Sequence, residues 1–316
     1  MLLTNWQLKD IYFGAYSIEE TEDGYLQAFQ YTAAQMDYFE KVSDFWYPRC
    51  FASTAKTLEF VTGARKVSFA YKIIWKGSED SFELAVDGLI TDIRYVKDLP
   101  DEGTLEFILP AGEKRVTVYL PADATVLIRD LDVDAPVSRP RKNEKVLWLG
   151  DSITQGYGPL RSGSTYVSVA NRVLDYDIIN QGIGGYVYDK NSLMKMDGYH
   201  PDKLIVALGT NQFGAETMDD VEQYYETLIG IYGSEIPILC ISPLWRGDIP
   251  EGIPTLFSFC EKVKAIAGSY DNVSVVDGLL LVPHLPEYYL DLLHPNCLGA
   301  EVYGRNLVEA IRRLGF

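Results

Sequence analysis

The sequence predicts an α/β domain with a mostly parallel sheet, preceded by a domain of antiparallel β-strands. Two observations carry this prediction. Residues 1–140 contain short apolar runs with a two-residue period, separated by turn residues. Beyond residue 141, runs that are apolar on both faces alternate with helical patterns, as in sheets covered by helices on each side. We therefore expect a β-domain at 1–140 and a three-layer α/β/α domain at 141–316.

The β-domain prediction depends on alternation. Residues 67–75 place apolar or aromatic side chains at every second position. The same period recurs at 82–86, 105–109, 116–120 and 126–128. Asp87-Gly88 and Ala111-Gly112 provide turn chemistry between these runs. Several short strands at close spacing indicate an antiparallel sandwich of the jelly-roll kind.

Changes in the hydrophobic pattern along the chain predict the remaining elements. Residues 1–55 have no clear period, and we expect strands mixed with a short helix there. Residues 134–143 combine two prolines with polar side chains and read as a linker. After it, we expect strands at 145–149, 176–180, 203–208, 236–242 and 273–276, and helices near 164–174, 219–233, 254–269 and 298–314.

Composition excludes two classes of partner. The formal net charge of -17 over 316 residues disfavours nucleic acid and anionic membranes, because both are bound through excess Lys and Arg. No apolar run approaches the roughly 18 residues that a membrane span needs. The N-terminus lacks the basic and apolar regions of a signal peptide. We expect a cytoplasmic protein with reduced, scattered cysteines; a mature secreted protein is the alternative.

One serine stands where chemistry is expected in such a fold. The block Gly150-Asp151-Ser152 directly follows the apolar run 145–149 and precedes a predicted helix. A hydroxyl at that place lies outside the sheet, next to free backbone N–H groups and a helix N-terminus. Ligands of open parallel sheets bind beyond the carboxyl ends of the strands. We therefore predict Ser152 as a nucleophile, with a simple helix cap as the alternative.

A base and its orienting carboxylate precede the last predicted helix. His294 is the candidate general base, since neutral imidazole accepts a proton near neutral pH. Asp291 lies three residues earlier, so a turn brings its carboxylate to the second ring nitrogen. The other histidines, His200 and His284, have no nearby upstream Asp. The predicted triad is therefore Ser152, His294 and Asp291.

Two further motifs supply donors for an oxyanion. One follows the second predicted strand of the α/β domain and contains three glycines. We choose the backbone N–H of Gly185, with Gly182 and Gly184 as alternatives, because glycine lets backbone approach a substrate closely. The side-chain amide of Asn211, after the third strand, and the Ser152 N–H complete the predicted oxyanion hole.

These four blocks resemble the SGNH hydrolase superfamily, also called GDSL esterases. That family has a Ser in a GDS block, an oxyanion Gly, an Asn in a GxN block and a D-x-x-H block, in the order found here. The resemblance covers residues 144–316 and implies a flavodoxin-like α/β/α fold and ester hydrolysis without metal or cofactor. One departure is Gln212, where many relatives carry Asp after the block Asn. Two-domain relatives with a leading β-sandwich are similar to acetyl-xylan esterases.

The predicted function is that of a serine esterase for short acyl esters, acetyl esters of sugars or oligosaccharides above all.

 The alternatives with the same triad are an acyltransferase and a lipase or thioesterase for longer acyl chains. The alternative from another class is a carbohydrate-binding protein whose hydrolase domain is inactive. Trp245 and Arg246, at the end of the fourth strand, are candidate substrate-binding residues, since Trp stacks on sugars and Arg anchors polar groups. An ordinary packed loop is the alternative for both.

Overall fold

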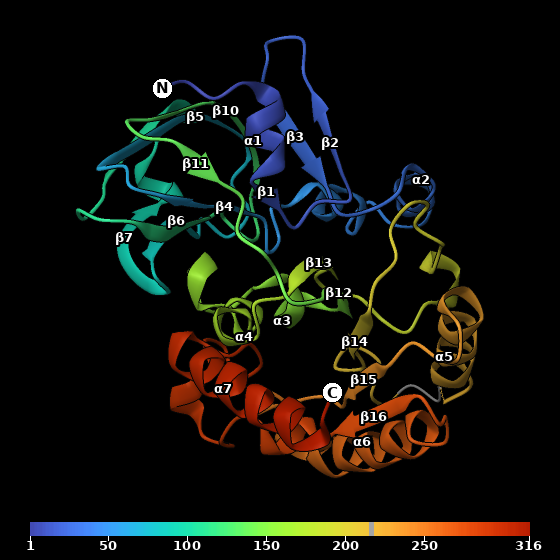
Figure 1. The fold of residues 1–316 in the computed structure, drawn as a ribbon. Coiled ribbons are helices and arrows are strands. Elements are labelled where there is room, and N and C mark those ends of the chain that lie inside the picture. Colours follow the sequence, from blue (N-terminus) through green and yellow to red (C-terminus); the bar gives the residue numbers. More distant parts are fainter. Residues whose placement is uncertain (215–217) are drawn as a thin grey trace.

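The computed structural model describes residues 1–214 and 218–316, and it divides the strands into three sheets (Figure 1). Two antiparallel sheets lie in the N-terminal part of the chain. The first has the order β2 (Ser17–Glu20), β3 (Leu26–Phe29), β10 (Thr125–Val133), β5 (Lys66–Trp75) and β8 (Glu102–Ile108). The second has the order β1 (Tyr12–Phe13), β4 (Thr57–Thr62), β9 (Lys114–Tyr119), β6 (Ser81–Val86) and β7 (Leu89–Tyr95), with β11 (Val137–Ser138) paired to β4.

The two antiparallel sheets share one buried apolar cluster. It takes alternate residues of β5, such as Val67 and Phe69, together with Phe60 of β4 and Val116 of β9. The two-residue period of the sequence therefore reflects one buried face on each sheet. The predicted strands are confirmed, and β4, β7 and the two-residue β11 are additional strands that the sequence analysis did not identify.

Two helices, where one was expected, lie in the first 55 residues: α1 (Asn5–Asp10) and α2 (Ala33–Val42). Each begins with a capping box, in which a threonine and a glutamine three residues later bond reciprocally. Thr32 and Gln35 form this box at α2. The short 3-10 helix η1 (Tyr47–Phe51) follows α2.

The third sheet is parallel and has the order β13 (Asp177–Gly182), β12 (Lys145–Gly150), β14 (Lys203–Ala207), β15 (Ile238–Ile241) and β16 (Val273–Val276). Its longer helices are α4 (Tyr166–Leu174), α5 (Met218–Tyr232), α6 (Ile253–Ala267) and α7 (Cys297–Leu314). These elements confirm the predicted ones to within about two residues at most ends. The order is that of flavodoxin-like sheets.

Helices cover both faces of this sheet, as the doubly apolar strands predicted. Trp148 and Ile205 belong to a cluster with α4 and α7, whereas their neighbours Leu147 and Leu204 belong to a cluster with α5 and α6. Successive strand residues thus point to opposite helical layers. The second cluster also contains Phe39 of α2, so part of the N-terminal region packs on the α/β core.

The segment 134–143, predicted as an irregular linker, is held on both sides. Val137 and Ser138 pair with β4, and Lys142 bonds Glu59 and Asp175. The segment is therefore held by strand pairing and by ion pairs. The sequence analysis did not predict either, because the two prolines favoured an irregular linker. The segment therefore fixes the approach of the two regions.

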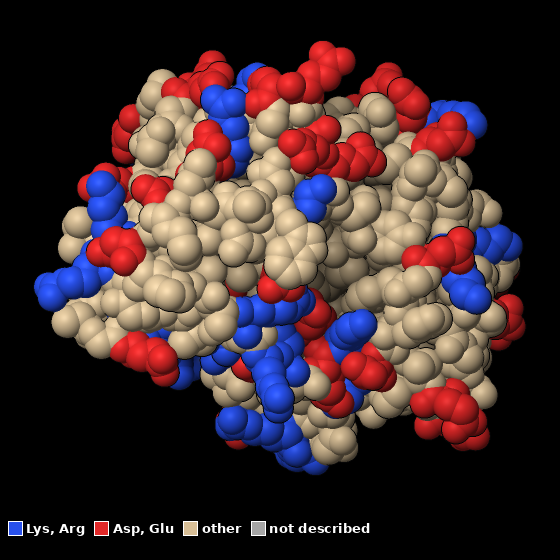
Figure 2. All heavy atoms as spheres, turned by 45° about the horizontal axis from the view of Figure 1, so that its top comes forward, with Lys and Arg blue, Asp and Glu red and all other residues tan. Residues whose placement is uncertain are grey.

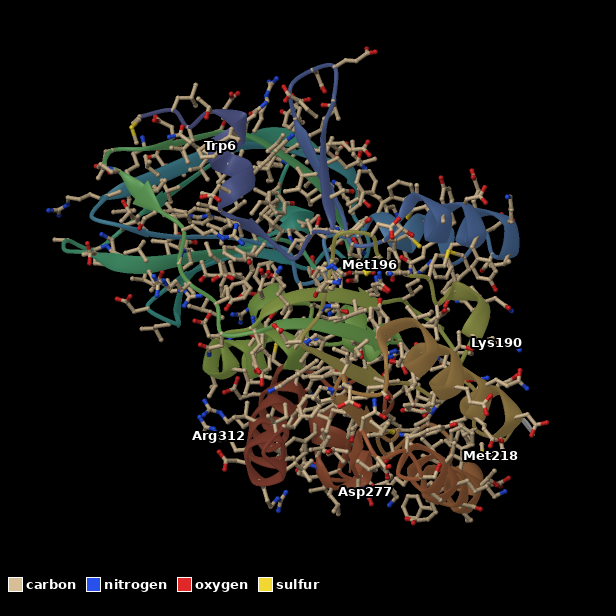
Figure 3. The ribbon with its side chains drawn as sticks, turned by 45° about the vertical axis from the view of Figure 1, so that its right-hand side comes forward. Trp6, Lys190, Met196, Met218, Asp277 and Arg312 are labelled. Atoms are coloured by element: carbon tan, nitrogen blue, oxygen red, sulfur yellow. The ribbon has the colours of Figure 1, made fainter. Side chains whose placement is uncertain are left out.

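The molecular surface mixes both signs of charge. On the face in Figure 2, basic side chains gather at the lower centre beside acidic ones, while other acidic side chains are scattered around the edges. Figure 3 shows Met196 where the N-terminal region meets the α/β region, and Trp6 far from that boundary. Within the described residues, no helix combines the length and the apolar character needed to cross a bilayer.

Candidate active site

Ser152 stands directly after β12, the strand that lies between β13 and β14. The chain leaves β12 toward β13 on one side and later returns to β14 on the other, which opens a crevice at the carboxyl end of β12. A Cβ atom on Gly150 would lie 2.1 Å from Oγ1 of Thr154, so the tight return of the chain requires glycine there. The sequence thus places Ser152 at the rim of the sheet.

The helix that begins at Ser152 is short. It is the single turn α3 (Ser152–Gln155), capped by the Asp151 carboxylate and ended by Gly156 with a φ of 116°. Gly156 closes the turn because its left-handed conformation suits glycine. The N–H groups of one turn, rather than the dipole of a long helix, are therefore available beside the serine.

The three predicted triad residues meet in one hydrogen-bonded chain. Oγ of Ser152 lies 2.9 Å from Nε2 of His294, and Nδ1 of His294 lies 2.7 Å from Oδ2 of Asp291. Partial burial raises the pKa of Asp291, but hydrogen bonds from His294 outweigh it and leave the pKa below its usual value. The carboxylate therefore stays ionised and favours the tautomer with the proton on Nδ1, which leaves Nε2 free to accept.

A short loop fixes the base and its partner. The backbone N–H groups of Leu293 and His294 both donate to Oδ1 of Asp291, at 3.1 and 2.8 Å. Leu292 has a φ of 65°, and its carbonyl accepts the N–H of Gly247. The imidazole also packs edge-on against Tyr157, with 4.6 Å between ring centroids. The loop therefore holds the imidazole from two sides.

Hydrogen bonding separates the three glycines that compete for the oxyanion role. The N–H of Gly182 donates to Asn180, and the N–H of Gly184 donates to Oε1 of Gln155 at 2.6 Å. The N–H of Gly185 has no acceptor among the described residues. A donor must be free to bind a substrate oxygen, so this arrangement favours Gly185 over the other two.

Asn211 lies beside this glycine loop. Its Nδ2 atom donates to the carbonyl of Tyr186 at 2.9 Å, which leaves its second amide hydrogen for another acceptor. Gln212, the departure from the family pattern, accepts the N–H of Tyr188 through Oε1 at 2.6 Å. The glutamine therefore ties the Asn211 loop to the glycine loop, and the network between them is intact.

Gln155, the last residue of α3, is a site residue to which the sequence analysis gave no role. Besides bonding Gly184, it donates through Nε2 to Oδ1 of Asp123, at 2.5 Å. Asp123 comes from the N-terminal region and is buried. Only the neighbourhood of Ser152 pointed to Gln155, and no pattern in the sequence pointed to Asp123.

A second group from the N-terminal region borders the glycine loop. A Cβ atom on Gly185 would lie 3.1 Å from Cε1 of Phe45 and 3.8 Å from Nε1 of Trp46. One on Gly184 would lie 3.2 Å from Nε of Arg49. The segment that carries these side chains lies in the part of the sequence without a clear period, and nothing in it signalled a site.

Trp245 and Arg246 lie near the site but are engaged with the protein itself. The Trp245 ring stacks on His284 with 5.5 Å between centroids. Arg246 pairs with Asp248 at 2.5 Å and donates to the carbonyl of Thr210 at 2.8 Å. Arg246 therefore stabilises the loop that carries Asn211. A substrate-binding role for Trp245 or Arg246 stays a prediction.

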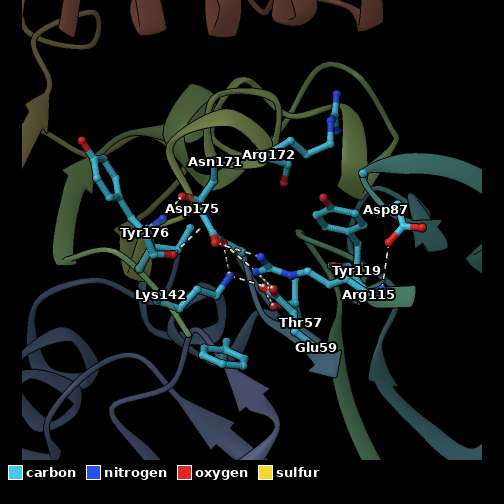
Figure 4. A pocket seen from close by; sticks show the side chains of 16 residues that line it. Thr57, Glu59, Asp87, Arg115, Tyr119, Lys142, Asn171, Arg172, Asp175 and Tyr176 are labelled. Atoms are coloured by element: carbon cyan, nitrogen blue, oxygen red, sulfur yellow. Dashed lines mark hydrogen bonds and ion pairs between the residues drawn. The ribbon is translucent and has the colours of Figure 1, made fainter. Parts of the chain in front are cut away.

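The cavity in Figure 4 lies elsewhere, between the two regions of the chain, and has a volume of about 270 Å³. None of the residues that line it belongs to the predicted site. Two cations, Arg115 and Lys142, and two carboxylates, Glu59 and Asp175, bond one another across one side of it. Neither there nor elsewhere in 1–214 and 218–316 do three or more His, Cys, Asp or Glu side chains gather as metal ligands would.

Comparisons with known proteins agree with this arrangement. Residues 148–302 match the model of the GDSL-like Lipase/Acylhydrolase family. The matched residues therefore form an SGNH hydrolase domain, the class with this serine block. The chain is an ester hydrolase, similar to carbohydrate esterases. No curated protein matches it in sequence.

Solved structures share the fold over most of the chain. A salicylyl-acyltransferase from a tetracycline biosynthetic pathway is 18% identical with a TM-score of 0.75, over 96% of this chain and 94% of the other. A family two carbohydrate esterase from Clostridium thermocellum, in complex with cellohexaose, is 18% identical with a TM-score of 0.65, over 84% and 94%. An acetyl xylan esterase from the rumen bacterium Butyrivibrio proteoclasticus is 17% identical with a TM-score of 0.61, over 83% and 90%. At these identities the likeness shows the fold alone.

Proposed function

We propose that the chain is a serine esterase that removes short acyl groups, acetyl above all, from carbohydrate esters through an acyl-enzyme intermediate. The observation that carries the proposal is the continuous relay from the Ser152 hydroxyl through His294 to Asp291, with contacts of 2.9 and 2.7 Å. Both distances suit hydrogen bonds that can pass a proton during nucleophilic attack.

In the first half of the reaction, Oγ of Ser152 attacks the ester carbonyl carbon while its proton passes to Nε2 of His294. The carbonyl oxygen becomes an oxyanion. The bond from carbon to the alcohol oxygen then breaks, and Nε2 returns the proton to the departing alkoxide. The alcohol leaves, and the acyl group stays on Ser152. Asp291 stabilises the imidazolium that exists between the two proton transfers.

In the second half, water replaces the alcohol. His294 takes a proton from the water as its oxygen attacks the acyl carbon, and a second oxyanion forms. The bond from carbon to Oγ breaks, and Nε2 gives its proton back to Ser152. The carboxylic acid leaves, and the enzyme is restored.

The oxyanion would be held by the N–H groups of Ser152 and Gly185 and the amide of Asn211. The free N–H of Gly185 and the tie between Asn211 and Tyr186 support this assignment. Each such donor is typically worth about 3 kcal/mol of transition-state stabilisation. This stabilisation is larger than the net contribution of a typical surface hydrogen bond to folding.

The carbohydrate part of the proposal rests on the architecture. Both carbohydrate esterases named above are similar in fold over more than four fifths of this chain. We further propose that residues 1–140 form a jelly-roll-like β-sandwich domain and residues 141–316 the catalytic domain. The apolar cluster shared by the two antiparallel sheets supports the sandwich.

The test compares wild type with Ser152→Ala on p-nitrophenyl acetate and on acetylated xylo-oligosaccharides, with a fluorophosphonate probe as an independent reporter. Wild type should release acetate and take up the probe at Ser152, and the variant should do neither. The exposed Ser269, at the end of α6, offers a matched control as Ser269→Ala. Undiminished turnover by folded Ser152→Ala protein would overturn the proposal.

An acyltransferase is the second candidate, because the salicylyl-acyltransferase aligns with 96% of this chain, including both regions. The first half of the reaction is then unchanged, and an alcohol or amine acceptor takes the place of water. Product analysis with acetyl donor and candidate sugar acceptors separates the two. Acylated acceptor exceeding free acid in water would favour the transferase.

A further inference from the structure

Arg49 lies against the glycine loop that the proposed oxyanion hole uses. Its Nε atom is 3.2 Å from the place of a Cβ on Gly184, and its Cζ atom is 3.6 Å from the centre of the Phe45 ring. The Trp75 ring lies 5.6 Å from Cζ on another side. Stacking on Phe45 fixes the plane of the guanidinium and covers its face. Its edge is then the part that can bind a ligand.

Most of that edge has no partner among the residues that the structure describes. A guanidinium has five N–H donors, and the described hydrogen bonds of Arg49 use one, from Nη1 to the carbonyl of Phe45 at 2.6 Å. No carboxylate lies within ion-pair distance of it in residues 1–214 and 218–316, although most arginines of this acidic chain have one. The other unpaired arginines, Arg65, Arg141 and Arg313, are exposed to water, whereas Arg49 is only partly exposed.

The carboxylate of Asp123, whose pKa Arg49 influences, already accepts hydrogen bonds from other groups. Asp123 accepts bonds from Gln155 and from the N–H of Ser78, and burial raises its pKa against the opposing influence of Ser78 and Arg49. Its two oxygens are thus directed at other donors. Arg49 remains a half-buried cation without a paired anion, beside the place where an ester would react.

We propose that Arg49 is a specificity-determining residue that binds a carboxylate of the substrate next to the ester that is cleaved. The preferred substrates are then acyl esters that carry a carboxylate, such as O-acetylated sugar acids. This inference rests on the proposed esterase function. It names a subset of its substrates.

The chemistry of the group fits this ligand. An arginine fork binds a carboxylate through two parallel N–H···O bonds. A net charge of -17 repels anions from the protein as a whole, so selection of an anionic ester needs a local cation. Arg49 supplies that cation at the glycine loop, where the Phe45 ring covers one face of the guanidinium.

The experiment uses pairs of esters that differ only in charge. For a carboxylate on the alcohol side, the pair is 3-acetoxybenzoate and 3-acetoxybenzamide. For a carboxylate on the acyl side, it is the p-nitrophenyl esters of succinic acid and of succinamic acid. The ratio of kcat/KM within each pair is measured for wild type, Arg49→Gln and Arg49→Lys, at low and high salt.

Wild type should favour the charged member of one pair by about tenfold, and the pair that responds identifies the side of the ester that faces Arg49. Arg49→Gln should abolish the preference, and Arg49→Lys should keep part of it, because lysine retains the charge but not the fork. High salt should weaken the wild-type preference. Arg94→Gln, which changes an exposed arginine already paired with Asp92, is the matched control and should leave every ratio unchanged.

Two results would overturn the inference. One is an equal ratio in wild type and Arg49→Gln. The other is equal binding of the charged and the uncharged ester in both pairs to Ser152→Ala protein, measured by calorimetry without turnover. If wild type hydrolyses none of the four esters, the proposed function fails instead. The calorimetry then still decides whether Arg49 binds the carboxylate.

Discussion

Two of the junctions between the two regions of this chain differ in how their charges are paired. At the cavity of Figure 4, Arg115 and Lys142 are paired with Glu59 and Asp175, so both signs are matched. At the glycine loop, Arg49 faces no paired carboxylate among the described residues. Charges that only join two surfaces are satisfied within the protein, because an unpaired buried charge is costly. The unmatched charge of Arg49 is the observation on which our proposal of a carboxylate site rests.

We expect the largest effect from a change in the hydrogen-bonded chain of Ser152, His294 and Asp291. Asp291→Asn should lower kcat by about 10⁴-fold, because an amide favours the wrong imidazole tautomer. The folded structure should be retained, since the asparagine can still bond the loop N–H groups through its oxygen. Steady-state kinetics with p-nitrophenyl acetate and circular dichroism measure both. A fall of less than tenfold would contradict the assigned role.

The matched junction should instead control stability. Arg115→Met removes the bonds to Glu59 and Asp175 and leaves their carboxylates with Lys142 alone. We expect a loss of about 3 kcal/mol in the free energy of unfolding, with little change in kcat. Urea unfolding measures the loss.

Arg94→Met, which breaks an exposed pair with Asp92, is the control and should cost under about 1 kcal/mol. If Arg115→Met lowered kcat as strongly as it lowered stability, the two junctions would not be separate in function.

At the junction beside the glycine loop, the hydrogen bonds of Gln155 should affect kcat. Gln155→Leu removes the bonds to the Gly184 N–H and to Asp123 while keeping a side chain of similar size. The glycine loop then loses its anchor, and kcat should fall by about tenfold to a hundredfold. Gln223→Leu, which removes a surface bond from Lys190, should leave kcat unchanged. An unaltered rate in the Gln155 variant would show that the loop is held by other contacts.

The smallest effect that we expect is the change in the free energy of unfolding with pH that Asp151 causes. Burial raises the pKa of Asp151 to about 7, against lowering by the Ile153 N–H and by Arg246. The folded state then keeps a proton that the unfolded state releases above its pKa of 3.8, so this stabilisation is complete at low pH and lost as pH rises through 7. We expect the unfolding free energy to fall by about 1 kcal/mol between pH 6 and pH 8.

Asp151→Asn, which keeps the helix cap, should abolish that fall in urea titrations at the two pH values. Asp175 at the matched junction behaves oppositely. Burial alone would raise its pKa, but Arg115 and Lys142 bring it below its usual value. Its contribution is therefore lost as pH decreases. Equal pH dependence of wild type and Asp151→Asn would contradict the raised pKa.

The sequence by itself determined the parts of this protein that depend on local pattern. Period-two runs predicted the antiparallel strands, and doubly apolar runs predicted a sheet with helices on both faces. Ser152, Asp291, His294 and Asn211 were predicted together because short motifs at strand ends must share one rim of a parallel sheet. The contact of 2.9 Å between Ser152 and His294 joins positions far apart in the chain, whereas Asp291 and His294, 2.7 Å apart, lie three residues from each other.

Only the tertiary structure decided what the N-terminal region brings to that rim. Phe45, Arg49 and Asp123 lie in segments whose local pattern resembles any loop or turn. Their meaning comes from contacts with Gly184, Gly185 and Gln155, which are more than thirty positions away. Local periodicity records which face of an element is buried but not which distant element covers it. The packing of the two regions alone fixes that pairing.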